Sequence, residues 1–522
     1  MSTAQSNSTV AAGATEPSRN PRSDATPAAS QPSPSRQRAR ALELPPPIAM
    51  LGVPFDQVTY AQTLDVFGQM IASRRPHYVA TANVDFAVQA LADIELQRIL
   101  ADADLVLCDG MPLVQASRFL GNPLPERIAG SDLVPQLLAE AERRRWRVFF
   151  LGGTETSIAR ATENVQRQYA KLQLVGSYSP PFKPLLEMDH EDIVRRLRDT
   201  RPDILLVAFG CPKQEKWINM QFRHTGVPVS MGVGATIDFL GGSVLRAPLW
   251  MQRIGFEWLF RLLQEPRRLF RRYLTDFWVF GRAILRQWWQ LRGRRSDAGR
   301  NAQVTCEPIE EGACEIVRVA GHLNTPTVQH CKALWTRLAQ GDAHVLLDLS
   351  QVRFIDSTGV GLLLRLQKHF RADDRQLVLV APTKSVLRAL SLMRLKEFLP
   401  MASDLSAARR LLKERIVEPN VVITKRSPGP EKPLVWQGDI AAANKEAVWS
   451  MTRMHLELAR DPQAQVHINL AGVRFIDSSG VGLMVRARKE AVQRGIQLKF
   501  ADPSPAVLNV LRTLRMEQKL LD

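Results

Sequence analysis

An internal repeat is the feature that most limits how the C-terminal part of this chain can fold. The segment HVLLDLSQVRFIDSTGVGLLLRL at 344–366 aligns without a gap to QVHINLAGVRFIDSSGVGLMVRA at 465–487, with 13 of 23 positions identical and an offset of 121 residues. A repeat at this distance indicates two copies of one domain. Each copy reads as an apolar strand, a tight turn, an amphipathic helix, a further strand (376–381 and 496–501) and a final helix.

The two copies are assigned to residues 303–416 and 419–522. A polar run at 425–433 lies near their junction. A strand-like segment at 421–423 comes before this run, so the sequence leaves the boundary between the copies open.

Upstream of the repeat, apolar runs alternate with helical patterns. Strands are predicted at 78–83, 104–109, 147–153, 203–210 and 227–234, and the segment 86–100 is amphipathic. This alternation predicts an α/β fold with a Rossmann-like parallel sheet over 46–245, followed by two small α/β domains. Ligands of such sheets bind beyond the carboxyl ends of the strands. Polar and glycine-rich residues gather at these ends, at 81–85, 109–110, 152–154, 210–215 and 232–238.

The composition changes abruptly at 246–295. This segment holds 12 Arg, no Lys and three acids, together with five of the ten tryptophans. Arginine interleaved with aromatic residues at helical spacing is typical of a helix that lies on a membrane surface. The alternative is that the aromatic side chains pack onto the preceding domain while the arginines form a solvated face. No helix-turn-helix, finger or RNA-binding signature accompanies the basic segment, so DNA is a weaker alternative partner.

Overall composition sets wider limits on function. The 522 residues carry a formal net charge of +17, which suggests an anionic partner such as a phosphate-bearing substrate, a lipid headgroup or nucleic acid. Five cysteines without a C-x-x-C pair indicate neither a disulfide framework nor a zinc ribbon, so we expect a reducing cytoplasm. No apolar stretch is long enough to span a membrane and no signal peptide is recognisable. Residues 1–45, rich in Ser, Ala, Pro, Thr and Arg, predict a disordered tail.

Asp109 is the candidate general base. It follows an apolar strand and precedes Gly110, so its carboxylate should lie at the carboxyl edge of the sheet, within reach of an acceptor hydroxyl. An Asp at this place is also a common helix cap. Because no metal-ligand spacing is present, a nucleotide-sugar enzyme of this kind would neutralise its leaving diphosphate with arginine and backbone N–H groups, without a metal cofactor.

An ordered set of motifs from Leu51 to Tyr273 resembles the WecG/TagA/CpsF glycosyltransferases of family 26. The segments are Thr81-Ala82-Asn83, Asp109-Gly110-Met111-Pro112, 126-ERIAGSD-132, Gly152-Gly153, 210-GCPKQEKWI-218, 232-GVGATIDFLGG-242, 246-RAPLW-250, 257-EWLFRLLQEPRR-268 and Arg271-Arg272-Tyr273. The resemblance implies a metal-independent inverting enzyme that moves a hexose-type sugar from a UDP donor to a polyprenyl-diphosphate-linked sugar. It also implies a peripheral position on the cytoplasmic face of the cell membrane.

The resemblance assigns roles to individual residues. Asp109 is the implied catalytic base and Thr81 its polar neighbour in the acceptor site. Asn83, Gln214 and Asp238 would line the donor pocket, with Arg127 near the diphosphate. Three arginines of the appendage at 246–295 would contact donor phosphates or the membrane: Arg261, Arg268 and Arg271. Alternative structural roles remain, since Gln214 could cap the following helix and Asp238 could be a loop residue.

The repeated domain resembles STAS domains, the fold of sulfate transporters and anti-sigma-factor antagonists. The resemblance is carried by 348-DLSQVRFIDSTGVGLL-363, with Gly321 upstream and its counterpart Gly438 in the second copy. In bacterial antagonists a kinase phosphorylates the first Ser of this turn, which corresponds to Ser357 and Ser478. A partner kinase or anti-sigma factor is therefore implied. The alternative is a protein-binding or dimerising domain in which the serine only caps a helix.

These inferences predict a membrane-surface glycosyltransferase of exopolysaccharide or cell-envelope polymer synthesis with two regulatory STAS domains. Self-association is expected and binding of nucleic acid is not. The alternative is a scaffold or phosphoregulated anti-sigma-factor antagonist whose transferase domain has lost turnover. The sequence leaves the sugar, the acceptor glycan and the effect of the STAS domains on the enzyme open.

Overall fold

The computed structural model describes residues 44–242, 247–248, 251, 257–264, 266–292, 304–307, 314–417, 434–459 and 465–521. The tail predicted at 1–45 lies outside the described residues except for its last two positions. The polar run at 425–433 and the strand predicted at 421–423 also lie outside them.

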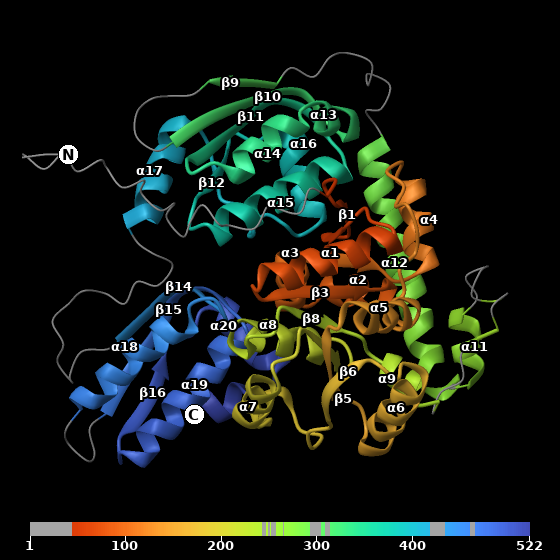
Figure 1. The fold of residues 1–522 in the computed structure, drawn as a ribbon. Coiled ribbons are helices and arrows are strands. Elements are labelled where there is room, and N and C mark those ends of the chain that lie inside the picture. The colour runs from red at the N-terminus through yellow and green to blue at the C-terminus, as the bar shows by residue number, and fades with distance from the viewer. Residues whose placement is uncertain are drawn as a thin grey trace, which may run out of the picture. The chain divides into compact units, whose positions relative to one another are not determined.

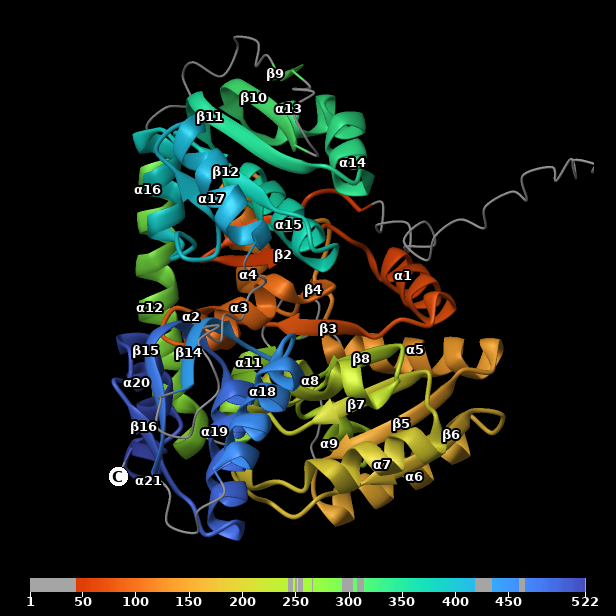
Figure 2. The same cartoon turned by 90° about the vertical axis from the view of Figure 1, so that its left-hand side faces the viewer.

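A six-stranded parallel sheet organises the N-terminal region (Figure 1). Its strands are β3 (His77–Ala82), β4 (Leu105–Cys108), β5 (Arg147–Gly152), β6 (Gln173–Tyr178), β7 (Ile204–Ala208) and β8 (Val229–Gly232). Their order is β4-β3-β8-β7-β5-β6, which the reader can follow from β3 to β6 in Figure 2. The five predicted strands are confirmed. The sixth, β6, was missed because this edge strand has no fully buried residue and therefore no clear apolar run.

Helices cover both faces of this sheet, because alternate residues of one strand point to opposite sides. Tyr78 and Ala80 belong to one buried cluster, and Val79 between them belongs to another. The helices are α1 (Tyr60–Ser73), α2 (Val84–Ala90), α3 (Ile94–Asp102), α4 (Met111–Phe119), α5 (Gly130–Arg144), α6 (Glu155–Gln168), α7 (His190–Thr200), α8 (Lys213–Thr225) and α9 (Thr236–Leu240). A hairpin of β1 (Ile48–Met50) and β2 (Val53–Phe55) comes before them.

The amphipathic segment 86–100 is divided between two helices, α2 and α3, and the sequence pattern did not predict this division. The side chain of Asp93 accepts a hydrogen bond from Leu96 N at 3.0 Å and begins α3. An Asp at this position satisfies a free N–H of a new helix, and this local bond competes with continuation of α2. The break between α2 and α3 places the start of α3 at Asp93 and Ile94.

The Arg- and Trp-rich appendage contains α11 (Glu257–Gln264) and the long α12 (Pro266–Arg292). The inner face of α12 packs against α2, Ile284 is buried, and Trp288 stacks on Phe119 with ring centroids 4.9 Å apart. Its other face exposes large apolar side chains: Phe270, Leu274, Phe277, Trp278, Leu285 and Trp289. Some of the aromatic side chains therefore pack onto the preceding domain, as the alternative predicted, and the membrane contact stays a prediction. No helix in the described part of the chain is long and apolar enough to cross a membrane.

In both repeat copies a long strand in the middle of a sheet runs directly into a helix; the strands are parallel except for β9 of the first copy, which pairs antiparallel with β10. The first copy contains β9 (Val304–Glu307), β10 (Cys314–Leu323), α13 (Thr325–His330), α14 (Lys332–Gln340), β11 (His344–Ile355), α15 (Ser357–Ala372), β12 (Leu377–Val380), α16 (Lys384–Leu392), β13 (Met401–Ala402) and α17 (Leu405–Val417). The second contains β14 (Leu434–Ile440), α18 (Lys445–Leu458), β15 (Gln465–Ile476), α19 (Ser478–Gln493), β16 (Gln497–Ala501), α20 (Pro505–Thr513) and α21 (Glu517–Leu521). Asp356 and Asp477 cap α15 and α19 with their carboxylates.

Candidate active site

Asp109 lies at the carboxyl end of β4, where its backbone N–H donates to Ala82 O at 2.9 Å. Burial raises the pKa of Asp109 to about 6, against the opposing effect of Arg127 and Arg261, while Glu257 raises it further. A carboxyl group with a pKa near neutrality is largely ionised at pH 7, and its carboxylate is basic enough to accept a proton. The local environment therefore suits a general base.

Arg127 holds the loop before α5 to the appendage. Its guanidinium lies 2.5 Å from the Asp132 carboxylate and 3.2 Å from that of Glu257 on α11. On the same helix, Arg261 lies 3.8 Å from Glu257 and covers the ring of Phe239 at 4.8 Å. The appendage thus brings a second arginine to the edge of the sheet that carries Asp109.

Thr81 and Asn83 lie at the end of the neighbouring strand, β3. The hydroxyl of buried Thr81 donates to Gly232 O of β8 at 3.0 Å. The side chain of Asn83 accepts from Phe86 N at 3.2 Å and caps α2. Thr81 therefore joins two strand ends at the same edge of the sheet, and Asn83 positions the helix that follows.

Gln214 joins two glycine loops from inside the protein. Its side-chain oxygen accepts from Gly210 N at 3.2 Å and Gly234 N at 3.1 Å, and its amide nitrogen donates to Glu215 at 2.7 Å. Burial raises the pKa of Glu215 to about 8, so this side chain is largely neutral at pH 7. The buried position of Gln214 makes it a support for the loops that follow β7 and β8.

The remaining predicted site residues are Asp238, Arg268 and Arg271. Asp238 accepts a hydrogen bond from the Ser157 hydroxyl on α6. Arg271 lies on α12 with an exposed side chain, and the side chain of Arg268 falls outside the described residues. The structure therefore brings Asp109, Arg127 and Arg261 into one charged cluster, with Thr81 at the same edge.

Three members of this charged and polar region were missed as site residues. Asp132 and Glu257 bind Arg127, and the Tyr60 hydroxyl accepts from Ala129 N at 3.1 Å. Glu257 had a signal in the sequence, since it is one of only three acids in the basic segment 246–295. Tyr60 had none, because it lies before the first quoted segment, which begins at Thr81, in a region without a distinctive pattern.

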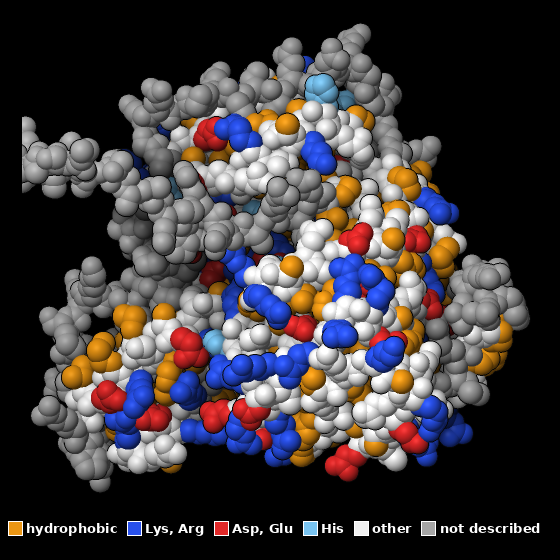
Figure 3. Space-filling model, in the orientation of Figure 1, with side chains coloured by type: hydrophobic (Ala, Val, Ile, Leu, Met, Phe, Trp, Pro, Cys, Tyr) orange, Lys and Arg blue, Asp and Glu red, His pale blue; other side chains and the backbone are white. Residues whose placement is uncertain are grey.

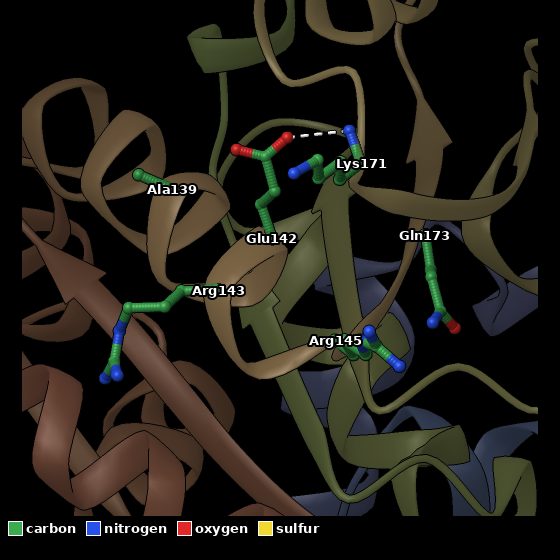
Figure 4. Close-up of a pocket in the computed structure, with 6 residues that line it drawn as sticks. All are labelled: Ala139, Glu142, Arg143, Arg145, Lys171 and Gln173. Atoms are coloured by element: carbon green, nitrogen blue, oxygen red, sulfur yellow. Dashed lines mark hydrogen bonds between the residues drawn. The ribbon is translucent and has the colours of Figure 1, made fainter.

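A surface cleft of about 630 Å³ lies away from this cluster (Figure 4). Its lining residues are Ala139, Glu142, Arg143, Arg145, Lys171 and Gln173. Lys171 N donates to the Glu142 carboxylate at 2.7 Å. Arg145 and Gln173 lie at the amino ends of β5 and β6, opposite the edge at which ligands of parallel sheets bind. We therefore assign no substrate to this cleft.

The charge available for an anionic ligand comes from arginine. In the described part of the chain, no group of three or more His, Cys, Asp or Glu side chains could hold a metal ion. Arg127 and Arg261 both act on the pKa of Asp109 and can offer guanidinium groups to a diphosphate. On the face shown in Figure 3, Lys and Arg side chains gather in the lower middle of the view, with Asp and Glu side chains beside them.

Comparison with known proteins separates two kinds of domain. The model of the "Glycosyl transferase WecG/TagA/CpsF family" matches residues 48–294. An N-acetylglucosaminyldiphosphoundecaprenol N-acetyl-beta-D-mannosaminyltransferase of Bacillus spizizenii is 35% identical over 199 residues, which cover 38% of this chain and 75% of the relative. The chain belongs to the WecG/TagA/CpsF glycosyltransferase family. A Staphylococcus aureus protein of the same name is 28% identical over 226 residues, 43% of this chain and 87% of the relative.

The STAS domain model matches the two repeat copies of this glycosyltransferase, at 308–408 and 427–520. A putative anti-sigma factor antagonist from Thermotoga maritima is similar at 24% identity with a TM-score of 0.19, covering 21% of this chain and 93% of that structure. The unphosphorylated anti-sigma factor antagonist SpoIIAA is similar at 22% identity with a TM-score of 0.19, covering 21% and 96%. The α/β fold and both resemblances inferred from the sequence are confirmed.

The structure places both serines predicted as phosphorylation sites in the interior. Ser357 and Ser478 are each 0% exposed, at the first positions of α15 and α19. The capping role falls to the preceding aspartates, because Asp356 and Asp477 accept the helix N–H bonds. The serines are therefore not the N-caps, and their hydroxyls are free to bind other parts of the chain.

Proposed function

We propose that this chain is a metal-independent inverting glycosyltransferase that moves a hexose-type sugar from a UDP-sugar to a polyprenyl-diphosphate-linked sugar. The observation that carries the proposal is Asp109, a carboxylate of raised pKa at the carboxyl edge of the sheet, whose ionised form is favoured by the charges of Arg127 and Arg261. The names of the relatives give an N-acetylmannosaminyl group as the sugar and N-acetylglucosaminyldiphosphoundecaprenol as the acceptor. UDP-N-acetylmannosamine as the donor and a polyprenyl-diphosphate-N-acetylglucosamine as the acceptor are therefore the first pair to test.

The proposed reaction is a single displacement at the anomeric carbon. Asp109 takes the proton of the acceptor hydroxyl, and the acceptor oxygen attacks the anomeric carbon from the face opposite the diphosphate. The bond between that carbon and the diphosphate oxygen breaks, and UDP leaves with the electron pair. Arg127 and Arg261 stabilise the charge that develops on the leaving diphosphate. For this step, the Arg127 guanidinium must release the Glu257 carboxylate and bind phosphate oxygens in its place.

The lipid-linked acceptor would meet the enzyme at the exposed face of α12, on the inner surface of the cell membrane. Phe277 and Trp278 are 70% and 67% exposed, and arginines at 267, 271, 282 and 286 lie on the same helix with exposed side chains. Aromatic side chains at the level of lipid headgroups and guanidinium groups on their phosphates suit a helix lying in the interface. The role proposed for the STAS domains is regulation of this membrane enzyme in cell-envelope polymer synthesis.

The decisive experiment is an assay of UDP release by the full chain. UDP-N-acetylmannosamine and a panel of other UDP-sugars are tested with a short-chain polyprenyl-diphosphate-N-acetylglucosamine acceptor, with and without EDTA. We expect acceptor-dependent release that persists in EDTA and falls about 10²–10⁴-fold in Asp109→Asn, the usual size of a general-base effect. Asp65→Asn is the matched control, because Asp65 is an exposed residue of α1.

Two outcomes would argue against this function. Near-normal turnover of Asp109→Asn would remove the assigned base. If the wild-type protein releases no UDP with any donor of the panel, the alternative is favoured: a scaffold or anti-sigma-factor antagonist without turnover. Binding of a kinase or an anti-sigma factor would then be tested next.

A further inference from the structure

The start of α19 in the second STAS domain is bound by a carboxylate of the transferase domain. Ser478 N donates to Glu95 Oε1 at 2.6 Å, and the Ser478 hydroxyl donates to Glu95 Oε2 at 2.9 Å. Glu95 lies in the first turn of α3 and is 3% exposed. One carboxylate thus takes up both hydrogens that residue 478 can donate.

A buried lysine holds this carboxylate in place. Lys216 Nζ on α8 lies 2.9 Å from Glu95 and 2.7 Å from Asp93. Burial opposes the charge of Lys216, but the two carboxylates outweigh burial and raise its pKa. The ammonium group therefore forms ion pairs with two carboxylates of the transferase domain itself. We call Asp93, Glu95 and Lys216 the Glu95 socket.

Two carboxylates already lie beside Ser478: that of Glu95, which it binds, and that of the preceding residue, Asp477. The Asp477 carboxylate accepts from Ser479 N, Gly480 N and Ala442 N at 2.8–3.0 Å. Burial, and then the charge of Glu95, raise the pKa of Asp477. A further anion at position 478 would face both carboxylates in a buried place, where like charges repel strongly.

The first STAS domain presents the same turn to the N-terminal region and its appendage, but to an uncharged group. The Gln287 amide of α12 donates to the Ser357 hydroxyl at 3.1 Å and to Ala49 O at 3.1 Å, and accepts from Leu51 N at 3.0 Å. A Cβ on Gly361 would lie 1.8 Å from Pro47 O, so only glycine permits this approach. Both serine turns are thus occupied by groups of their own chain.

We propose that the transferase domain of the same chain is the partner that both STAS turns recognise, and that the Glu95 socket holds the second STAS domain only while residue 478 is uncharged. The socket accepts a hydroxyl that donates to Glu95 and rejects an anion at the same position. A negative group on Ser478, of which a phosphoryl group is the natural example, therefore releases the domain from α3 and α8. This inference does not depend on the transferase activity, because binding within the chain is what it describes.

Hydrogen exchange of the full chain, followed by mass spectrometry, tests the socket without an activity assay. Ser478→Asp should increase exchange at the start of α19 and at α3 at least tenfold, because opening of the interface becomes more frequent. Ser478→Ala adds no charge and should leave these segments protected to within a few fold. Ser450→Asp is the matched control, since Ser450 is an exposed residue of α18 in the same domain.

A second substitution distinguishes loss of the interface from loss of the fold. Glu95→Gln in the Ser478→Asp background removes the repelling carboxylate and should restore most of the protection. The core strand β15 should stay protected in every variant. The proposal is overturned if Ser478→Asp behaves like Ser450→Asp, if Ser478→Ala opens the interface as much as Ser478→Asp, or if Glu95→Gln restores nothing.

Discussion

Glu257 of α11 and Arg127 of the loop before α5 form an ion pair of 3.2 Å across 130 residues of sequence. Arg127 and Glu257 both act on the pKa of Asp109, in opposite directions. The appendage is therefore part of the electrostatic surroundings of the proposed base, in addition to any role at a membrane.

Glu257→Gln should shift the acid limb of the pH profile of kcat/KM to lower pH. Wild-type activity is expected to rise with a midpoint near 6, because burial sets the pKa of Asp109 at about 6 and Glu257 contributes to raising it. The uncharged amide keeps the size of the side chain and removes only the charge. Exposed Glu191→Gln is the control, and an identical midpoint in both variants would contradict the assigned coupling.

Gly232→Ala should destabilise the fold and reduce turnover together. A Cβ at this position would lie 2.7 Å from Gln214 Nε2 and 2.8 Å from Glu215 Oε1, both buried. Overpacking of this kind costs about 1–3 kcal/mol of unfolding free energy, and it would displace the carbonyl that Thr81 binds. Urea unfolding and UDP release measure the two effects.

Gly281→Ala is the contrasting variant for that experiment. An added Cβ there meets nothing within 4 Å, and the residue lies inside α12. Replacing a helical Gly by Ala generally adds about 0.5–1 kcal/mol of stability. Equal destabilisation by both variants would show that the crowded position of Gly232 is not the cause.

The fold could be predicted from the sequence wherever the residues of a strand formed a clear apolar run. The buried strand β7 and the turn at Asp356 and Ser357 are formed by residues that are adjacent in the sequence. Local sequence patterns were therefore sufficient to predict them. The apolar run before Asp109 also predicted its place at the carboxyl end of β4, while its role as the base stays a prediction. The division of 86–100 into two helices was missed because the capping bond of Asp93 was not recognised as a competitor of a continuous helix.

The contacts between domains could not be predicted, since they join residues that no local pattern relates. Glu95 reads as an ordinary polar position of an amphipathic helix, yet it is buried against Ser478, 383 residues away. Gln287 lies in the Arg- and Trp-rich segment, where nothing in the sequence indicated a contact with the STAS domains, and it binds β1, the turn after β1 and the first STAS domain. Gln214 was expected in the donor pocket, and its bonds to two glycine loops became visible only with the folded chain.

Asp276→Asn should stabilise the protein at pH 8 more than at pH 5. Burial and the nearby Asp85 raise the pKa of Asp276 to about 6, against the opposing effect of Arg272. The protonated form therefore stabilises the fold fully below pH 4, and this contribution is lost as the pH rises through about 6. The Asn variant has no proton to lose, so its Tm advantage over wild type should grow over that interval. An advantage that is independent of pH would contradict the assignment.

Replacing Phe277 and Trp278 together by serine should weaken binding to vesicles of anionic phospholipid. The two side chains are 70% and 67% exposed on α12, so their removal leaves the core intact and Tm should change little. Insertion of each into the interface would contribute about 1–2 kcal/mol, so the loss in vesicle co-sedimentation should exceed tenfold. Phe182→Ser is the matched control, because Phe182 is 97% exposed and lies outside the appendage. If both variants bind vesicles as the wild type does, the exposed face of α12 is not the membrane contact; if Phe182→Ser weakens binding equally, the contact is not specific to this helix.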